Sequence, residues 1–203
     1  MTSALHSPDQ DLVDERPRDH HVCPWWMGYV ISSPLRKIGE NPKKILAPLV
    51  EPGMTAVDIG CAMGFFSLPL ARMVGDDGRV VCVDLQRRML STLERRARRK
   101  GLDHIIETRE CGEDDLGLDH LLGRADLALA VHVVHEVPDP EQFLAACRAV
   151  LRPAGRLLVI EPKGHVSIES FDRTAQLAHK VGFIDRDLLP PGKALQRLFE
   201  NPG

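Results

Sequence analysis

Val57–Phe66 reads VDIGCAMGFF, and this stretch decides how the rest of the 203-residue chain is interpreted. An apolar run at 54–59 ends at Gly60, and an amphipathic run begins soon after Gly64. This pattern predicts a strand, a tight turn and a helix, in that order. Because such a turn exposes backbone N–H groups at the carboxyl end of a strand, the stretch predicts a ligand site there.

The small residues of the turn indicate which ligand it suits. A dinucleotide fingerprint has the glycine pattern G-x-G-x-x-G, which brings a pyrophosphate onto the helix N-terminus. Counted from Gly60, the chain has Ala62 and Phe65 where the second and third glycines belong. The carboxylate of Asp58 also suits an ammonium group better than a pyrophosphate. The turn therefore disfavours a nucleotide-dependent oxidoreductase and favours a cationic ligand.

A second carboxylate follows at the end of the next predicted strand. The run 80–84 is apolar up to Asp84, which lies about 20 residues beyond Gly64, the spacing at which an acid binds a ribose in open α/β sheets. The two oxygens of Asp84 can accept hydrogen bonds from both ribose hydroxyls. Asp84 can also cap the helix expected to begin near Gln86, and the two roles are compatible.

Strand and helix patterns alternate along the chain and predict an α/β fold. Strands are expected at 54–59, 79–84, 105–109, 125–132 and 156–161, with short ones at 181–184 and 193–199, and helices at 64–74, 86–100, 113–122, 139–151 and 167–181. Alternating elements with short connections imply a doubly wound, mostly parallel sheet with helices on both faces. Residues 1–18 are predicted to be disordered, 19–50 to form a helical cap or lid, and 51–203 to form the main domain.

Composition excludes several classes of protein. Hydrophobic residues make up 43% and charged residues 27% of the chain, as in globular proteins. No apolar run approaches the roughly 20 residues that span a bilayer, and no signal-peptide core is found, so a cytoplasmic protein is expected. A net charge of −3 gives no general attraction for nucleic acid. Five cysteines without paired spacing fit reduced thiols.

One basic cluster stands apart, on the helix predicted at 86–100. It consists of Arg87, Arg88, Arg95, Arg96, Arg98, Arg99 and Lys100. A solvated outer face near a helix C-terminus accounts for such a cluster. A docking surface for an acidic partner or for RNA is the alternative.

The glycine turn resembles the D-x-G-x-G-x-G motif of class I S-adenosylmethionine-dependent methyltransferases, with Ala62 in place of the middle glycine. Residues 125–139 and 151–162 resemble the fourth- and fifth-strand segments of the same family, so the resemblance covers roughly residues 50–162. It is closest to the small-molecule branch that includes ubiquinone and menaquinone methyltransferases. The resemblance implies a Rossmann-like fold, S-adenosylmethionine as cofactor, and in-line methyl transfer to a small-molecule acceptor.

The resemblance also implies which residues contact the cofactor. The methionine end is expected near Asp58 and Gly60, the ribose on Asp84, and the adenine between Leu85 and the loop at 111–113. The full cofactor set is Asp58, Gly60, Cys61, Ala62, Gly64, Phe65, Asp84, Leu85, Gly112, Glu113 and Val131.

Ionisable and aromatic residues mark the reaction side. Strand ends one, four and five converge in a doubly wound sheet, and groups gathered there are candidates for proton transfer. The candidate catalytic residues are His135, Glu136 and His165, and the candidate acceptor pocket is Trp25, Trp26, Tyr29, Glu161 and Lys163. As alternatives, His135 only orients a loop, Glu136 caps a turn, and the tryptophans anchor the N-terminal helix.

Two further alternatives bear on function. His20, His21 and Cys23 are residue types that bind zinc, but a fourth ligand is missing, so no metal is expected. A catalytically silent domain that keeps the fold and serves as a partner-binding or regulatory module is the rival to an enzyme. The sequence leaves open the identity of the acceptor, the atom that is methylated and the oligomeric state.

Overall fold

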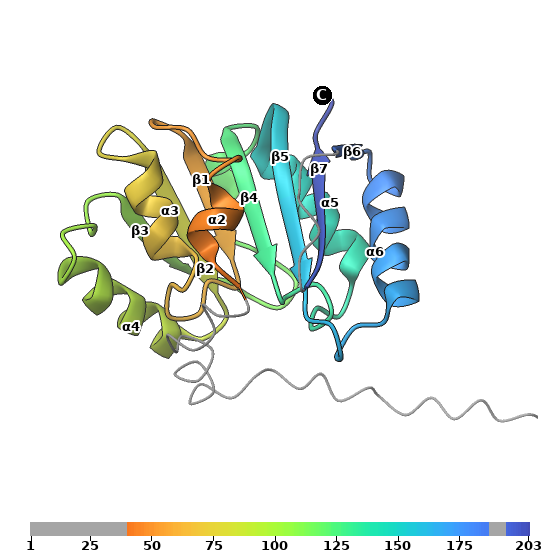
Figure 1. Cartoon of the computed structure of the whole chain (residues 1–203), viewed down its shortest axis with the longest axis horizontal. Coiled ribbons are helices and arrows are strands. Elements are labelled where there is room, and N and C mark those ends of the chain that lie inside the picture. Colours follow the sequence, from red (N-terminus) through yellow and green to blue (C-terminus); the bar gives the residue numbers. More distant parts are fainter. Residues whose placement is uncertain (1–39, 187–193) are drawn as a thin grey trace, which may run out of the picture.

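The computed structural model describes residues 40–186 and 194–203, and within them one seven-stranded sheet forms the centre of the molecule (Figure 1). The strands are β1 Thr55–Ile59, β2 Arg79–Asp84, β3 Ile106–Glu110, β4 Ala125–Val131, β5 Leu151–Glu161, β6 Ile184–Arg186 and β7 Leu195–Glu200. Their order across the sheet is β3-β2-β1-β4-β5-β7-β6. Strands β1 to β5 pair in parallel, and β7 is antiparallel to both β5 and β6. The predicted mostly parallel sheet is therefore confirmed.

Helices cover both faces of this sheet, as the alternation predicted (Figure 1). The helical elements are α2 Pro42–Leu46, α3 Ser67–Val74, α4 Arg87–Arg98, the short 3₁₀ helix η2 Asp119–Leu121, α5 Pro140–Val150 and α6 Ile168–Lys180. Apolar residues of α2, α3 and α4 pack in one layer, and those of α5 and α6 pack in the other. The sheet is thus doubly wound.

Strand β1 shows how the two layers divide the sheet. Ala56 belongs to the layer under α3 and α4, whereas Val57 and Ile59 belong to the layer under α5 and α6. Because both faces are covered, a central parallel strand is expected to be apolar throughout. Asp58 departs from this rule, since it is only 2% exposed. A buried carboxylate is costly unless it has partners, so its position indicates a functional role.

The helix predicted at 113–122 is wrong. The segment is a loop that ends in η2, and Gly117 has a φ of 62°. The side chain of Asp115 accepts the N–H of Gly117 at 2.8 Å. A left-handed residue and a turn closed by an aspartate both interrupt a helix. Leu118 and Leu121 are buried, and their spacing accounts for the helical pattern in the sequence.

Strand β5 begins at Leu151, earlier than the predicted 156. The side-chain amide of Asn201 donates to the Leu151 carbonyl at 2.9 Å, and the Asn201 carbonyl accepts the N–H of Ala154 at 2.8 Å. These contacts hold residues 152–155, which lie between the predicted helix and the predicted strand, along the sheet. The turn character persists locally, because Ala154 has a φ of 62° and the pairing of β4 with β5 shifts register there.

Only residues 40–50 of the predicted 19–50 cap are described. They contain α2, where the side chain of Asn41 accepts the N–H of Lys43 at 3.1 Å and so caps the first turn. Leu46 and Leu49 are buried in the same layer as α3. Residues 1–18 and the rest of the cap lie outside the described residues, as do Trp25, Trp26, Tyr29, His20, His21 and Cys23.

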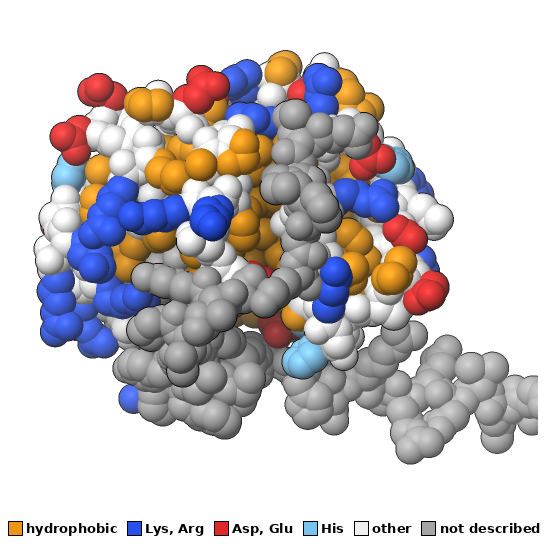
Figure 2. All heavy atoms as spheres, in the orientation of Figure 1, with side chains coloured by type: hydrophobic (Ala, Val, Ile, Leu, Met, Phe, Trp, Pro, Cys, Tyr) orange, Lys and Arg blue, Asp and Glu red, His pale blue; other side chains and the backbone are white. Residues whose placement is uncertain are grey.

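The predicted basic cluster lies on α4. Figure 2 shows Lys and Arg side chains grouped at the lower left, where Figure 1 places this helix. Leu90 and Leu93 are fully buried, most of the basic side chains are exposed, and Arg87 pairs with Glu94 at 3.3 Å. Arg96 is the exception, because it is half-buried and donates to the Met63 carbonyl of the glycine turn. This arrangement fits a solvated outer face, and the docking alternative stays a prediction. Among the described residues, no helix combines the length and apolarity needed to cross a membrane.

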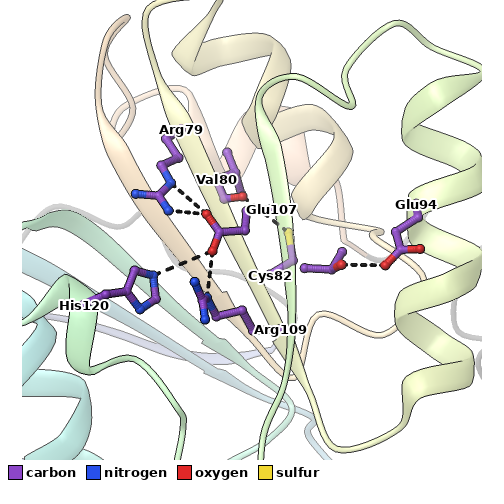
Figure 3. Close-up of polar contacts among 8 residues, drawn as sticks. Arg79, Val80, Cys82, Glu94, Glu107, Arg109 and His120 are labelled. Carbon is purple, nitrogen blue, oxygen red and sulfur yellow. Dashed lines mark hydrogen bonds and ion pairs between the residues drawn. The ribbon is translucent and has the colours of Figure 1, made fainter.

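An ion-pair network closes the β3 edge of the sheet (Figure 3). Glu107 of β3 accepts hydrogen bonds from Arg79 of β2 and from Arg109, and His120 of η2 lies 3.7 Å away. Individually, half-exposed pairs of this kind contribute little. Together they join β2, β3 and η2, the elements that flank the loop at 111–118.

Candidate active site

A cavity of about 360 Å³ opens at the carboxyl ends of β1, β2 and β4. This is where a doubly wound sheet binds ligands, and the volume is in the range of small-molecule sites. Ten of the predicted cofactor residues line it, namely Asp58, Gly60, Cys61, Ala62, Phe65, Asp84, Leu85, Gly112, Glu113 and Val131. The predicted catalytic residues His135, Glu136 and His165 line it too.

Three predicted site residues are described but do not line the cavity: Gly64, Glu161 and Lys163. Gly64 lies beneath the turn, where an added Cβ would be 2.3 Å from Cδ1 of Leu93. Glu161 is buried behind His135, and Lys163 is exposed. The structure therefore brings the predicted cofactor residues together, with Gly64 serving the packing of the turn.

Gly60 is required by a close approach within the protein. Its φ is 70°, and its N–H donates to the Val83 carbonyl at 2.8 Å. A Cβ at this position would be 2.1 Å from Cγ2 of Val133, a cavity-lining residue that follows β4. The glycine therefore lets the turn after β1 lie against the segment after β4.

Ala62 adopts the left-handed conformation expected of a glycine. Its φ is 46°, a region that costs a non-glycine residue roughly 1–2 kcal/mol. Its N–H donates to Oδ2 of Asp84 at 2.9 Å, and this contact holds the strained turn. The single departure from the family motif thus fits, with local strain.

Asp84 is held by backbone groups on two sides. Besides the Ala62 contact, its Oδ1 accepts the N–H of Gln86 at 2.9 Å. Gln86 is itself the N-cap residue of α4, which has no side-chain cap, so Asp84 fixes the segment before the helix and is not the N-cap that was predicted. Burial raises the pKa of the Asp84 carboxyl, while the two backbone hydrogen bonds lower it. Each oxygen accepts one of these bonds and retains a further lone pair. The carboxylate can therefore fix the segment before α4 and still bind hydroxyl groups in the cavity.

Asp58 is the more deeply buried of the two carboxylates. Its Oδ2 accepts a hydrogen bond of 2.5 Å from Oγ of Ser67, the first residue of α3. Burial raises the pKa of Asp58 to about 7, and repulsion from Asp84 adds to the shift although the Ser67 bond opposes it. Two carboxylates that repel each other at one cavity favour a cationic ligand.

His135 and Glu161 form a close pair across the ends of β4 and β5. Oε2 of Glu161 lies 2.5 Å from Nδ1 of His135, and its Oε1 accepts the His135 backbone N–H at 3.2 Å. The Glu161 side chain is 2% exposed, whereas that of His135 is 26% exposed and borders the cavity. The hydrogen bond to Glu161 raises the pKa of His135, although burial opposes the shift.

Further residues complete this side of the cavity, and the sequence did not assign them a role. His132, with a φ of 60°, lies at the end of β4, and its Nε2 is 2.8 Å from Oε1 of Glu40. Val133, Met89 and Phe143 contribute apolar wall. The two histidines three residues apart after β4 were the signal in the sequence, because Glu40 lies 92 positions away from His132.

The loop at 111–113 lines the same cavity as Leu85, and the adenine site expected between them stays a prediction. Its shape is set by the N–H of Gly112, which donates to the Asp115 carbonyl at 2.9 Å. Burial raises the pKa of the Cys111 thiol to about 11, and nearby carboxylates add to the shift. The thiol is therefore protonated at neutral pH. Within the described residues, the four cysteines are free and no cluster of metal-ligating side chains is found.

Comparison with known proteins gives the family. A family model described as "Methyltransferase domain" matches residues 57–159, which contain most of β1, all of β2 to β4 and most of β5. The chain therefore belongs to this family, and its sheet and glycine turn are those of the class I S-adenosylmethionine-dependent methyltransferases. The resemblance read from the sequence is confirmed, and S-adenosylmethionine is the cofactor that the family implies.

Two curated relatives illustrate the sequence similarity. A ubiquinone biosynthesis O-methyltransferase of Cereibacter sphaeroides is 32% identical over 139 residues, which cover 68% of this chain and 52% of that protein. An uncharacterised 37.1 kDa protein in transposon Tn4556 of Streptomyces fradiae is 37% identical over 115 residues, 55% of this chain and 31% of that protein. The chain thus spans about half or less of the length of these relatives.

A solved structure supports the fold independently. The crystal structure of an S-adenosylmethionine-dependent methyltransferase from Aquifex aeolicus matches with a TM-score of 0.79 at 22% identity. The match covers 89% of this chain and 100% of the other. At this level of identity the similarity establishes the fold alone.

Proposed function

We propose that this chain transfers a methyl group from S-adenosylmethionine to a small-molecule acceptor. The observation that carries the proposal is the pair of buried carboxylates, Asp58 and Asp84, which meet a backbone turn at an otherwise largely apolar cavity. We assign the catalytic domain to residues 51–203, because the sheet and the cavity lie within this range. The family match and the ubiquinone O-methyltransferase relative support the reaction class.

The described residues fit this cofactor. Asp58 is buried and repelled by Asp84, so the ammonium group of a methionine moiety relieves both costs. Asp84 has lone pairs left for two ribose hydroxyls, and Leu85 with the loop at 111–113 offers a site for adenine. When bound, the cofactor supplies a methyl group on a positively charged sulfur, which leaves as a neutral thioether.

The chain contributes mainly by holding the reactants in line. Good alignment of reacting groups lowers a barrier by about 7–11 kcal/mol. The turn at Gly60 and the carboxylates fix one reactant, and the residues after β4 and β5 border the space left for the other. His135, Glu136 and His165 are the groups that could accept a proton from the acceptor, and Lys163 stays a predicted acceptor contact.

Titration calorimetry with S-adenosylhomocysteine tests the proposal. Replacing Asp84 with Asn should weaken binding by about 1.5–3 kcal/mol, the range for hydrogen bonds to a charged acceptor. Asp76→Asn is the matched control, because the Asp76 side chain is 90% exposed on the α3–β2 connection. Unchanged affinity in Asp84→Asn, or no binding by the wild-type chain, contradicts the assignment.

The same measurement addresses the silent-module alternative. A regulatory module could bind S-adenosylhomocysteine, but it would show no turnover with any acceptor. Mass spectrometry of reaction mixtures for a product heavier by one methylene unit separates binding from catalysis. No observation of the structure favours the silent module.

A further inference from the structure

We propose that His135 accepts a proton from the methyl acceptor, that Glu161 positions it for this step, and that the acceptor is therefore a hydroxyl compound such as a phenol. This inference rests on the proposed function and narrows its substrate class. It begins from a contact that joins residues 26 positions apart in the chain.

Glu161 holds His135 by both of its oxygens. One oxygen accepts the backbone N–H and the other contacts ring Nδ1, so the position of the residue and the plane of its ring are both fixed. Glu161 is buried at the carboxyl end of β5. A buried carboxylate that binds the backbone and the ring of one histidine fits a positioning role.

The contact determines which ring nitrogen can accept a proton. An ionised carboxylate only accepts hydrogen bonds, so Nδ1 of His135 carries the hydrogen and Nε2 of the neutral ring has a free lone pair. The nearest carboxylate oxygen to Nε2 is Oε1 of Glu136 at 3.8 Å, which is beyond hydrogen-bonding distance. Because the ring borders the cavity, this lone pair is available to a bound acceptor.

The surrounding charges favour the protonated product of this step. Glu161 from β5 and the neighbouring Glu136 both stabilise an imidazolium at His135, and Asp84 and His132 also face Glu136. Burial raises the pKa of Glu136, which reduces its charge near neutral pH. The Glu161 contact is the largest effect on the pKa of His135 and raises it. A proton taken from the acceptor is therefore held next to Glu161.

The other two histidines at the cavity lack this arrangement. His132 contacts Glu40 through Nε2, the nitrogen that His135 leaves free. The backbone N–H of His165 donates to the Pro162 carbonyl at 3.2 Å. Among the three, His135 is the one that combines a buried carboxylate on Nδ1 with no carboxylate oxygen within hydrogen-bonding distance of Nε2.

The chemistry of this arrangement selects the acceptor. The acceptor O–H passes its proton to Nε2 of His135 while its oxygen forms a bond to the methyl carbon. The carbon–sulfur bond of the donor breaks, and its electron pair stays on sulfur. A neutral hydroxyl is a weak nucleophile until it loses its proton, whereas a neutral amine or a thiolate attacks without a base. A carboxylate-held base is therefore useful for a hydroxyl acceptor.

The test uses the full-length chain with two chromophoric acceptors that differ in the reacting atom, 4-nitrocatechol and 4-nitro-1,2-phenylenediamine. Turnover of the catechol is expected, and His135→Gln should lower kcat about a hundredfold or more, the lower end for general base catalysis, with KM little changed. Glu161→Gln should lower kcat by a smaller factor. Asp76→Asn, which removes the partner of the exposed His104, is the matched control and should leave kcat unchanged.

The pH profile distinguishes positioning from simple structural support. Activity needs neutral His135, so kcat rises with pH through the pKa of that histidine. Because Glu161 raises this pKa, Glu161→Gln should move the acid limb to lower pH, and Glu161→Asp should restore part of the wild-type limb. If Glu161 only supported the fold, Glu161→Gln would lower the melting temperature and leave the acid limb of the pH profile where it is.

Nuclear magnetic resonance of the histidine rings gives a readout that needs no turnover. In the chain saturated with S-adenosylhomocysteine, His135 should carry its hydrogen on Nδ1, and its pKa should lie above the ordinary value of a histidine. Glu161→Gln should lower that pKa. If this variant does not fold, the tautomer and titration of wild-type His135 decide the question. A hydrogen on Nε2 in the neutral ring overturns the proposal.

Failure of the inference and failure of the proposed function remain distinguishable. The chain could bind S-adenosylhomocysteine and yet fail to turn over the catechol, with or without turnover of the diamine. This result overturns the hydroxyl assignment and leaves cofactor binding intact. Unchanged catechol turnover in His135→Gln also overturns it. Absence of S-adenosylhomocysteine binding overturns the proposed function itself.

Discussion

The two sides of the cavity hold their charged groups in different ways. On the side of β1 and β2, Asp84 is held by the backbone N–H groups of Ala62 and Gln86. On the side of β4 and β5, charged side chains hold one another, as in the His135–Glu161 and His132–Glu40 contacts. Backbone groups cannot change charge, whereas each histidine pair can gain or lose a proton. The first side therefore suits binding, and the second suits proton transfer.

The two sides also differ in how far apart their partners lie along the chain. On the first side the Asp58–Ser67 contact spans nine positions, Asp84–Gln86 two and Asp84–Ala62 22, whereas on the second side His135–Glu161 spans 26 and His132–Glu40 spans 92. Short-range contacts follow from one strand–turn–helix unit, so a sequence pattern can encode them. The contacts on the second side exist only after the sheet has assembled.

The largest expected effect comes from the glycine that joins the two sides. Gly60 and Gly75 both have a φ of 70°. A Cβ added at Gly60 would lie 2.1 Å from Val133, whereas a Cβ added at Gly75 would have no atom within 4 Å. Gly75 has a ψ of −172°, in a region occupied almost only by glycine, so Gly75→Ala should cost about 1–3 kcal/mol of unfolding free energy from backbone strain. Gly60→Ala should cost about 1–3 kcal/mol more from overpacking, and should also weaken S-adenosylhomocysteine binding. Equal losses of unfolding free energy in the two variants, measured by denaturant unfolding, would contradict the clash between position 60 and Val133.

A smaller effect should appear in the pH dependence of Asp58. Its folded pKa of about 7 lies above the ordinary 3.8, so it stabilises the unliganded fold at acid pH and this contribution is lost as the pH rises through 7. Asp58→Asn should remove this decline and raise unliganded stability at pH 8 by on the order of 1–3 kcal/mol, since one pKa unit corresponds to about 1.4 kcal/mol. Urea unfolding of both proteins from pH 4 to 8 measures the difference.

Ligand binding should show the opposite pH trend. An ammonium group needs ionised Asp58, so wild-type affinity for S-adenosylhomocysteine should rise between pH 6 and pH 8. Asp58→Asn should bind more weakly and with a flatter pH dependence. If the affinities of the wild-type chain and of Asp58→Asn changed with pH in the same way, Asp58 would not contact the ligand.

The smallest effect concerns the strained alanine of the turn. Ala62→Gly relieves the left-handed backbone at φ 46°, which should outweigh the extra freedom of glycine in the unfolded chain and stabilise the protein by up to about 1 kcal/mol. Ala154→Gly, at φ 62° in β5, should give a similar gain. Only the Ala62 variant should alter S-adenosylhomocysteine affinity, because Ala62 lines the cavity and Ala154 does not. Thermal unfolding and calorimetry of the two variants check this.

The sequence by itself determined the sheet and the binding side of the cavity. The turn after β1, the acid that ends β2 and the alternation of elements are local patterns, and each is set by backbone geometry and by burial within a few neighbouring residues. This is why Asp58, Gly60 and Asp84 could be placed beside one cavity before the fold was known. The same reasoning failed at 113–122, where buried Leu118 and Leu121 produced helical spacing in a loop that Gly117 interrupts.

Only the tertiary structure decided how the second side is arranged. Sequence reasoning named His135 and Glu161 separately, as a catalytic candidate and an acceptor contact, and left their contact unseen. The contact depends on the register of β4 against β5, which brings Val131 beside Ile160. Likewise, Gly60 is required because Val133 lies against it, and not by the ligand alone. Contacts between strand ends depend on sheet order and register, and these are properties of the assembled chain.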